Sequence, residues 1–514
     1  MTLPPTRFDY GAPVPVDSDL GVVHFVAIGG AGMSGVARIM LDHGVSVQGS
    51  DMATSAVLGD LAARGARIHE GHDAAYLDGA DTVVVSSAIR ETNVELATAR
   101  ARGLRVLHRA QGLAATMQGA AARVAVAGAN GKTTTTAMLV ATLVECGEDP
   151  SFAVGGELVG LDTNARAGAG RAFVVEADES DGSFLVYRPH IALVTSVQAD
   201  HLDHYGSAAV VEEAYRAFVD TIEPGGLLVA CVDDPGAAAL ARWARESRRI
   251  RVLGYGTDPR ADVTLVDVVL DGRSSTARIE VNGQSATMQL PVPGDYNLRN
   301  AAAVVAATVC GLGLPLDQVC RALAGFRGVR RRFEFRGEVG GVSLVDDYAH
   351  NPAKVAAVVS SGARFVAGRG RLIAVFQPHL YSRTRDFATE FAAALAPADV
   401  VLVLDVYAAR EDPMPGVGSH LVVDELRTRW TADAVGDGWT DGVGEGAGDG
   451  VGDRHLVNDD LASAGGVDLT DLSVAADLVV SLARPGDLVL TIGAGDVTTI
   501  APRVLAGLRA RGDS

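Results

Sequence analysis

Residues 123–134 read Arg-Val-Ala-Val-Ala-Gly-Ala-Asn-Gly-Lys-Thr-Thr, and a helix-compatible segment follows at 135–146. A short apolar strand that passes through glycines into a helix is the context in which a phosphate-binding loop occurs. The glycines let backbone N–H groups turn toward phosphate oxygens, Lys132 supplies a positive charge, and the Thr133 hydroxyl can ligate Mg²⁺. The stretch therefore predicts a nucleotide-binding α/β domain.

The loop departs from the strict pattern at one position, because Val126 stands where the first glycine is expected. A plain strand-to-helix turn is the alternative interpretation. The chain contains only two lysines, Lys132 and Lys354. A lysine placed in this loop therefore favours phosphate binding.

The same alternation of β-branched runs with alanine-rich helical segments extends along the whole chain. Alternating strands and helices predict parallel sheets and an α/β fold. The expected strands are 22–28, 45–49, 82–86, 123–127, 173–176, 191–197, 227–232, 344–347, 372–376, 400–405 and 488–492.

A chain of 514 residues is long for one hydrophobic core, and three α/β units fit its length. We expect an N-terminal Rossmann-like domain at 20–119, a central phosphate-loop ATPase domain at 120–326, and a C-terminal Rossmann-like domain at 327–514. Within the central domain, 262–290 alternates apolar and polar residues around Asp-Gly and Asn-Gly turns, which predicts added β-hairpins. Residues 435–453 are rich in glycine and acids, and we expect a disordered insertion there rather than a cation site.

Composition excludes several classes of partner. The formal net charge of -19 opposes binding to nucleic acid, and no long basic stripe overcomes it. No apolar run reaches the roughly 20 residues of a membrane helix, and the N-terminus lacks a secretory signal, so we expect a cytoplasmic protein without a membrane span. The cysteines lack metal-ligand spacing and lie in apolar runs, which predicts buried thiols at Cys146, Cys231, Cys310 and Cys320.

A second glycine-rich turn occupies 29–35, between an expected strand and an expected helix. Gly30, Gly32 and Gly35 match the G-x-G-x-x-G pattern, and Asp51 ends the next strand, where an acid can contact a ribose or base. The turn predicts a nucleotide-type ligand at a helix N-terminus. From the residues alone, a nicotinamide dinucleotide is as compatible as a sugar nucleotide, and a purely structural turn is a third interpretation.

Acidic residues follow a buried strand in the run Glu-Ala-Asp-Glu-Ser-Asp at 176–181. Carboxylates at a strand end beside a phosphate loop are where Mg²⁺ is held; Glu176 is the preferred ligand, whereas Asp181 fits a solvated loop better. After the next strand comes His201, with His204 three residues further on. Two histidines suggest zinc, but no cysteine or third histidine is spaced nearby, so we favour a Mg²⁺-linked role for His201.

Polar clusters also follow the strands of the last third. Arg330, Arg331 and Arg332 form either a solvated charge run or a clamp on a transferring phosphoryl group. The polar segments 346–352 and 376–385 each lie at an expected strand end. Because polar groups at the carboxyl ends of parallel strands mark a ligand cleft, these segments predict a second part of the site.

In combination, these motifs resemble the Mur ligase family. The resemblance implies an N-terminal domain that holds UDP, a central domain that holds ATP and Mg²⁺, and a C-terminal domain that brings the amino acid. It implies ATP-dependent joining of L-alanine to the carboxylate of UDP-N-acetylmuramate through an acyl phosphate, in cytoplasmic peptidoglycan precursor synthesis. A relative that adds another amino acid or a peptide is the alternative. The segments that carry the resemblance are 24–35, 128–136, 176–181, 199–203, 294–300, 331–333, 346–352 and 376–385.

The resemblance also implies roles for individual residues. The ATP-binding set is Gly128, Ala129, Asn130, Gly131, Lys132, Thr133 and Thr134 with Asn297 and Asn300 near adenine, Arg331 near the phosphates and Asp347 near the ribose. The metal set is Thr133, Glu176 and His201, and the catalytic set is Lys132, Glu176, His201, Arg332 and His350. The UDP set is Gly30, Gly32, Gly35 and Asp51, and the amino-acid set is His350, His379 and Arg383.

Two other classes of function are alternatives to a ligase. A nicotinamide-dependent oxidoreductase accounts for the first glycine turn but leaves the phosphate loop, Glu176 and His201 without a role. A nucleotide-gated binding protein without amide synthesis accounts for the loop but not for the clusters at His350 and Arg383. Departures from the family pattern bear on amino-acid specificity more than on ATP use; they are Ala129, Asn130, Tyr296, Asn351 and Leu380.

Overall fold

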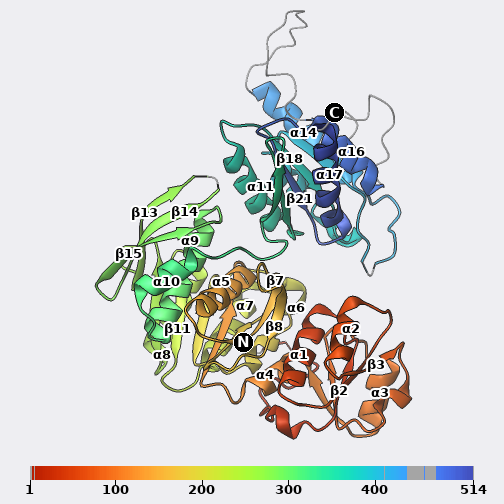
Figure 1. Ribbon diagram of the computed structural model, residues 1–514, viewed down its shortest axis with the longest axis vertical. Coiled ribbons are helices and arrows are strands. Elements are labelled where there is room, and N and C mark those ends of the chain that lie inside the picture. Colours follow the sequence, from red (N-terminus) through yellow and green to blue (C-terminus); the bar gives the residue numbers. More distant parts are fainter. Residues whose placement is uncertain are drawn as a thin grey trace, which may run out of the picture. The chain divides into compact units, whose positions relative to one another are not determined.

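The computed structural model describes residues 3–4, 6–271, 273–409, 411–436, 456–457 and 471–512. The chain forms two compact units, one of residues 1–270 and 274–327 and the other of residues 271–273 and 328–514 (Figure 1). The predicted insertion at 435–453 lies outside the described residues, except for its first two, which end a helix.

The first unit begins with a five-stranded parallel sheet of order β3-β2-β1-β4-β5. Its strands are β1 Val23–Val26, β2 Val47–Asp51, β3 Arg67–Glu70, β4 Thr82–Val85 and β5 Arg105–His108; its helices are α1 Ala31–Asp42, α2 Ala56–Ala63, α3 Val94–Ala101 and α4 Arg109–Met117. The strand order reverses between β1 and β4, which is the place where open α/β sheets bind ligands. The predicted glycine turn follows β1 there.

A ten-stranded sheet of order β15-β14-β13-β12-β11-β10-β6-β9-β7-β8 follows in the same unit. Its central strand β6 is parallel to both neighbours, β9 and β10, so the segments after these three strands meet at one edge. The strands are β6 Ala122–Ala127, β7 Ser151–Leu158, β8 Thr163–Arg166, β9 Ala172–Glu176, β10 Ile191–Val194, β11 Leu227–Cys231, β12 Arg251–Gly256, β13 Val263–Leu270, β14 Ser275–Val281 and β15 Gln284–Leu290. The helices are α5 Lys132–Glu145, α6 Leu202–Tyr205, α7 Ala208–Asp220, α8 Pro235–Ser247, α9 Asp295–Val305 and α10 Leu316–Leu323.

The predicted hairpins are confirmed, because β13, β14 and β15 pair antiparallel at one end of this sheet (Figure 1). The turn between β14 and β15 consists of Asn282 and Gly283, with φ of 51° and 73°. Two left-handed residues give the turn whose twist matches that of the flanking strands, which explains the Asn-Gly signal in the sequence.

The second unit contains a six-stranded sheet of order β16-β17-β21-β18-β19-β20, parallel apart from β16. Its strands are β16 Glu334–Val339, β17 Val342–Asp347, β18 Leu372–Phe376, β19 Val400–Val403, β20 Leu456–Val457 and β21 Leu488–Ile492. Its helices are α11 Pro352–Val366, α12 Tyr381–Asp386, α13 Ala388–Leu395, α14 His420–Gly436, α16 Leu472–Leu482 and α17 Ile500–Gly512. One core packs α11, α13 and α14 on the sheet, and a second packs α16 and α17.

The expected α/β fold is confirmed, with three sheets within the two units, and every expected strand is present. The sequence pattern missed the two-residue strand β20. It also missed β3, β5, β7, β8, β12 and β16, which carry exposed or half-exposed residues and lack a continuous apolar run. The thiols of Cys231 and Cys320 are buried as predicted, but the prediction is wrong for Cys146 and Cys310, which are partly exposed. No described helix is long and apolar enough to cross a membrane.

Candidate active site

The phosphate loop joins β6 to α5, and close contacts fix its glycines. Gly128 has φ of 137° and Gly131 has φ of 84°, both in the region that favours glycine. A Cβ atom at Gly128 would lie 2.1 Å from Thr195 Oγ1, and one at Gly131 would lie 2.8 Å from Asn300 Oδ1. Local packing therefore requires glycine at both positions.

The backbone between these glycines is held by the segment after β10. The Ala129 amide donates to the Ser196 carbonyl oxygen at 3.2 Å, and the Asn130 amide donates to Ser196 Oγ at 3.0 Å. The Asn130 side chain donates to Gln198 Oε1 at 3.0 Å. The loop is thus fixed before the first turn of α5, in which Thr134 is half-buried.

Lys132, the first residue of α5, lies among acids. Its Nζ donates to the Gly128 carbonyl oxygen at 2.7 Å and to Glu179 Oε1 at 2.8 Å. Burial by itself lowers the pKa of Lys132, but the charges of Glu179, Asp178 and Glu176 outweigh it and raise the pKa above its usual value. Burial also raises the pKa of Glu179, against the attraction of Lys132. The loop therefore keeps a charged ammonium where phosphate oxygens would approach.

Thr133 and Glu176 meet beside the loop. The Thr133 hydroxyl donates to Glu176 Oε1 at 2.8 Å, and the Gly155 amide donates to Glu176 Oε2 at 2.7 Å. Both carboxylate oxygens are therefore oriented by the chain. A hydroxyl and a carboxylate in contact offer the oxygen ligands that Mg²⁺ prefers.

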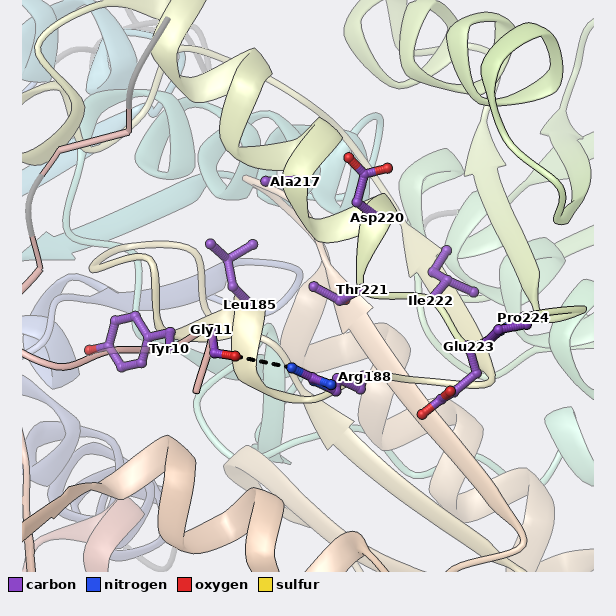
Figure 2. Close-up of a pocket in the computed structure, with 10 residues that line it drawn as sticks. All are labelled: Tyr10, Gly11, Leu185, Arg188, Ala217, Asp220, Thr221, Ile222, Glu223 and Pro224. Atoms are coloured by element: carbon purple, nitrogen blue, oxygen red, sulfur yellow. Dashed lines mark hydrogen bonds between the residues drawn. The ribbon is translucent and has the colours of Figure 1, made fainter. Parts of the chain in front are cut away.

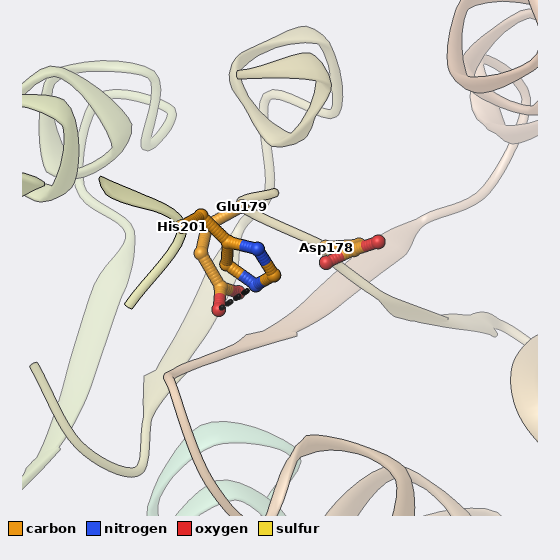
Figure 3. A group of neighbouring side chains, drawn as sticks. All are labelled: Asp178, Glu179 and His201. Atoms are coloured by element: carbon orange, nitrogen blue, oxygen red, sulfur yellow. Dashed lines mark ion pairs between the residues drawn. The ribbon is translucent and has the colours of Figure 1, made fainter. Parts of the chain in front are cut away.

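Asp178, Glu179 and His201 form a second group of possible ligands, with ligand atoms all within 4.8 Å of one another (Figure 3). His201 Nε2 lies 3.9 Å from Glu179 Oε1. His201 has φ of 54° and directly precedes α6, so a left-handed residue turns its ring toward the acids. This group contains two carboxylates and one imidazole. Such an oxygen-rich set suits Mg²⁺ better than zinc, which typically takes sets rich in nitrogen and sulfur. Sequence reasoning paired His201 with Glu176; the structure groups it with Asp178 and Glu179.

Asn297 and Asn300 lie on the first turns of α9, close to the same loop. Asn300 Nδ2 donates to Asn297 Oδ1 at 3.4 Å, and Asn297 Nδ2 donates to the Pro293 carbonyl oxygen at 2.7 Å. Asn300 also faces Gly131, as the contact of its Oδ1 shows. Asn300 therefore lies against the phosphate loop, and Asn297 is its hydrogen-bond partner.

The N-terminal glycine turn precedes α1 as predicted. Asp51 does not point freely into solvent, because its Oδ2 accepts a hydrogen bond from the Gly29 amide at 2.8 Å. Gly30 is the residue before α1, and Gly32 lies in its first turn. A Cβ atom at Gly35 would lie 3.0 Å from the Ala165 Cβ, so the third glycine lets α1 approach β8 of the central sheet.

In the second unit, Asp347 ends β17 and is buried. Its Oδ2 accepts from the Phe333 amide at 2.6 Å and its Oδ1 from the Ala349 amide at 2.8 Å. Burial raises the pKa of Asp347 to about 6. The guanidinium groups of Arg331 and Arg332 lie over the Tyr348 ring, at 4.8 and 5.5 Å from its centroid. Both arginines are half-buried, so they are not a solvated charge run.

His350, His379 and Arg383 come together in the same unit. The rings of His350 and His379 are 6.0 Å apart, and Arg383 Nη1 donates to the His350 carbonyl oxygen at 3.3 Å. His350 Nδ1 donates to the Tyr348 carbonyl oxygen at 2.9 Å, which leaves Nε2 as the acceptor. Burial lowers the pKa of His350 to about 4, so the imidazole is neutral at pH 7.

A cavity of about 490 Å³ lies elsewhere in the first unit (Figure 2). Its lining includes Arg188 and Glu223, which come shortly before β10 and β11, and Arg188 Nη2 donates to the Gly11 carbonyl oxygen at 3.1 Å. The amino ends of parallel strands lie at the sheet edge opposite the phosphate loop. This cavity is therefore separate from the candidate site.

The structure thus places the predicted residues in three groups. The N-terminal glycine turn with Asp51 and the residues around the phosphate loop lie in the first unit, and those from Arg331 onward lie in the second. Sequence reasoning missed Glu179, the buried partner of Lys132, although it belongs to the acidic run that was singled out. It also missed Tyr407, whose ring stacks on His379 with centroids 5.9 Å apart, because no motif marks an isolated tyrosine.

Three family models match consecutive parts of the chain. Residues 22–120 match "Mur ligase family, catalytic domain", residues 126–308 match "Mur ligase middle domain", and residues 331–495 match "Mur ligase, glutamate ligase domain". The matched segments cover most of the sequence and all three sheets.

Full-length relatives agree with these matches. The UDP-N-acetylmuramate--L-alanine ligase of Renibacterium salmoninarum is 48% identical over 493 residues, which cover 96% of this chain and 97% of the relative. The ligase of the same name from Kineococcus radiotolerans is 50% identical, with 96% and 98% covered. The crystal structure of the UDP-N-acetylmuramate-alanine ligase of Thermotoga maritima superposes with a TM-score of 0.71 at 26% identity, covering 96% of this chain and 99% of that one. The chain belongs to the Mur ligase family.

Proposed function

We propose that this chain joins L-alanine to the carboxylate of UDP-N-acetylmuramate and converts ATP to ADP and phosphate. The proposal is supported by full-length relatives of that name at 48% and 50% identity. The observation that carries the ATP-dependent part is the phosphate loop, with Lys132 charged among acids and Thr133 in contact with Glu176. The reaction uses ATP and a UDP-sugar, so we place it in the cytoplasm, in peptidoglycan precursor synthesis.

The first step is phosphoryl transfer. A carboxylate oxygen of the muramyl group attacks the γ-phosphorus of ATP, the bond to the β,γ-bridging oxygen breaks, and ADP leaves. The product is an acyl phosphate. Lys132 and the amides of the loop hold the β- and γ-phosphates, where a fixed positive charge acts on the charge that spreads over the transferring group. Arg331 and Arg332 are the proposed partners of the same phosphates from the second unit.

Magnesium fits the residues beside the loop. Thr133 and Glu176 would hold one ion, and His201, with Asp178 and Glu179 close by, would help to hold a second. When bound, Mg²⁺ neutralises phosphate charge and fixes the phosphate oxygens in place. The excess of carboxylates over the single Lys132 is the charge that such ions would balance.

The second step is amide formation. The amine of alanine attacks the acyl carbon, and phosphate leaves with the oxygen that the carboxylate supplied. His350 is the proposed acceptor for the proton of the amine at Nε2, because its Nδ1 already donates to the Tyr348 carbonyl oxygen. Arg383 is suited to the alanine carboxylate, because a guanidinium pairs with both of its oxygens. His379 is the third group that we place on the amino-acid side.

The remaining assignments concern the nucleotides. We propose that Asn297 and Asn300 lie near adenine and that Asp347 lies near the ATP ribose. Gly30, Gly32, Gly35 and Asp51 form the proposed UDP site. Membership of the Mur ligase family leaves no role for a nicotinamide cofactor, so the oxidoreductase alternative is set aside.

The test is phosphate release from ATP with UDP-N-acetylmuramate, Mg²⁺ and each amino acid in turn. We expect release with L-alanine to exceed release with every other amino acid and with a muropeptide by at least about tenfold, a discrimination of about 1.4 kcal/mol. Equal or faster release with another acceptor would mean that the chain is a related ligase with different specificity. No acceptor-dependent release at all would contradict the ligase proposal.

A further inference from the structure

The side chain of Arg109, a residue that no motif singled out, crosses the N-terminal glycine turn. Arg109 is the first residue of α4, which packs against α1 (Figure 1). A Cβ atom at Gly32 would lie 3.0 Å from both Cδ and Nη1 of Arg109. The second glycine of the G-x-G-x-x-G pattern therefore makes room for a guanidinium group, in addition to any ligand.

Arg109 is half-buried and has no ion pair or hydrogen bond of its side chain with any part of the chain that the structure describes. The adjacent residue His108 lies 3.6 Å from Asp181, whose carboxylate also accepts hydrogen bonds from the Ser87 hydroxyl and the Ser183 amide. His108, next to Arg109, is neutral at pH 7, because burial lowers its pKa to about 4. The guanidinium is only partly withdrawn from water, so an anion can still reach it. An anionic ligand would supply the missing partner.

The position of Arg109 indicates which anion. The first turn of α1 presents unpaired amides and the positive end of the helix dipole, which attract phosphate groups. The turn also lies where the strand order reverses between β1 and β4, with Ser87 shortly after β4 on the other side. Arg109 and the amides of α1 therefore face the same place from two helices. Two adjacent phosphates fit this arrangement better than a neutral sugar or base.

We propose that Arg109 binds the diphosphate of the UDP-sugar substrate, across Gly32 from the first turn of α1. The proposal rests on the proposed function, which supplies that substrate. It gives the diphosphate a charged partner in a site otherwise built of glycine amides and Asp51. It also makes the contribution of Arg109 specific to the phosphates, so uridine without phosphates gains nothing from it.

The test compares ligands with and without the diphosphate. Binding of UDP and of uridine to the full-length chain is measured by calorimetry or competition at one fixed salt concentration. We expect Arg109→Gln to weaken UDP binding by about 10- to 100-fold, the usual range for a charge-assisted hydrogen bond, and to change uridine binding less than about threefold. Arg109→Lys retains the charge but not the fork of donors, and should fall between wild type and Arg109→Gln.

A matched control and a kinetic readout separate binding from folding. Arg102→Gln removes an equal charge from the exposed end of α3, where Arg102 pairs with Asp78, and should leave UDP binding within about twofold. In turnover, Arg109→Gln should raise KM for UDP-N-acetylmuramate and leave KM for ATP unchanged.

Two outcomes would overturn the proposal while the proposed function stands. One is that the wild-type chain and the Arg109→Gln variant bind UDP with equal affinity. The other is that Arg109→Gln loses affinity for UDP and for uridine to the same extent, which would indicate that Arg109 only supports the fold of the domain. Wild-type chain that binds neither UDP nor UDP-N-acetylmuramate would overturn the proposed function as well.

Discussion

At the scale of single residues, the site depends on one cation held among several acids. Lys132 is in direct contact with Glu179, and Asp178 and Glu176 add negative charge that raises its pKa. A lysine so surrounded stays protonated over the whole working pH range. Its charge is therefore available to act on phosphate groups whenever a nucleotide is bound.

Lys132→Ala tests this role of the charge. We expect kcat to fall by about 100-fold or more, since the charge acts mostly on the transferring phosphoryl group. Arg123→Gln is the control, because Arg123 is a cation near the other end of β6, paired with Glu223. Steady-state kinetics should show near wild-type kcat for the control. Near wild-type kcat for a folded Lys132→Ala chain would exclude the role.

His108 gives the first unit a pH dependence. Its side chain is buried and close to Ser87 Oγ and Asp181, and burial lowers its pKa from the usual 6.5 to about 4. A histidine whose folded pKa is depressed stabilises the fold above the unfolded pKa, and that stability is lost as pH falls from about 6.5 toward 4. Between pH 7.5 and pH 5 the loss from this residue is about 2 kcal/mol.

His108→Asn retains an acceptor for the start of α4 and removes the titration. Denaturant unfolding at pH 7.5 and pH 5 should show a smaller loss of stability in this variant than in wild type. His43 offers a control of opposite sign, because Asp17 raises its pKa. His43→Gln should make the loss at low pH larger, and an unchanged slope in His108→Asn would contradict the assignment.

At the scale of elements, a glycine stands at each end of α5, and the two positions require glycine for different reasons. Gly131 precedes α5 in a left-handed conformation and lies against Asn300. Gly147 follows α5 with φ of 81°, and a Cβ atom added there would meet no non-neighbouring atom within 4 Å. Both positions penalise a side chain through the backbone. Only Gly131 adds a steric clash at the nucleotide site.

Gly131→Ala and Gly147→Ala separate these causes. Each should cost about 1 kcal/mol of stability, because alanine disfavours the left-handed region. ATP affinity, measured with a fluorescent nucleotide, should fall by at least about tenfold in Gly131→Ala and stay within about twofold in Gly147→Ala. An equal loss of affinity in both variants would show that the effect comes from the helix as a whole.

The same elements show what the sequence could predict. The phosphate loop, the N-terminal glycine turn and the β14–β15 turn were predictable, because the spacing of glycine, lysine and asparagine in each of them is typical of that kind of turn. Edge strands such as β8 and β16 were not, since half-exposed residues blur the apolar signal. Arg109 and Glu179 were missed because their importance comes from neighbours far along the chain, namely Gly32 and Lys132. The local spacing of residues does not show which side chains far apart in the sequence will be in contact.

At the scale of the whole molecule, the chain is divided into two compact units, and each contains its own clusters of buried apolar residues. The proposed UDP and ATP loops belong to the first unit, and His350, His379 and Arg383 belong to the second. The proposed reaction therefore requires contributions from both units. Their stabilities, however, need not be equal.

Calorimetry of the full-length chain should show two unfolding transitions. UDP at about 100 times its Kd should stabilise only the transition of the first unit, by about 2.7 kcal/mol, because its site lies there. The Arg109→Gln variant identifies that transition, since it should lose most of the UDP shift. A single transition that UDP raises as a whole would show that the units unfold together.

The central claim is that the muramyl carboxylate receives the γ-phosphate before the amine attacks. UDP-N-acetylmuramate labelled with ¹⁸O in both carboxylate oxygens tests it directly, with the released phosphate analysed by mass spectrometry after turnover with ATP, Mg²⁺ and L-alanine. An acyl phosphate predicts one ¹⁸O in each phosphate released and one ¹⁸O retained in the amide. Phosphate without ¹⁸O, formed at the rate of amide synthesis, would contradict the account.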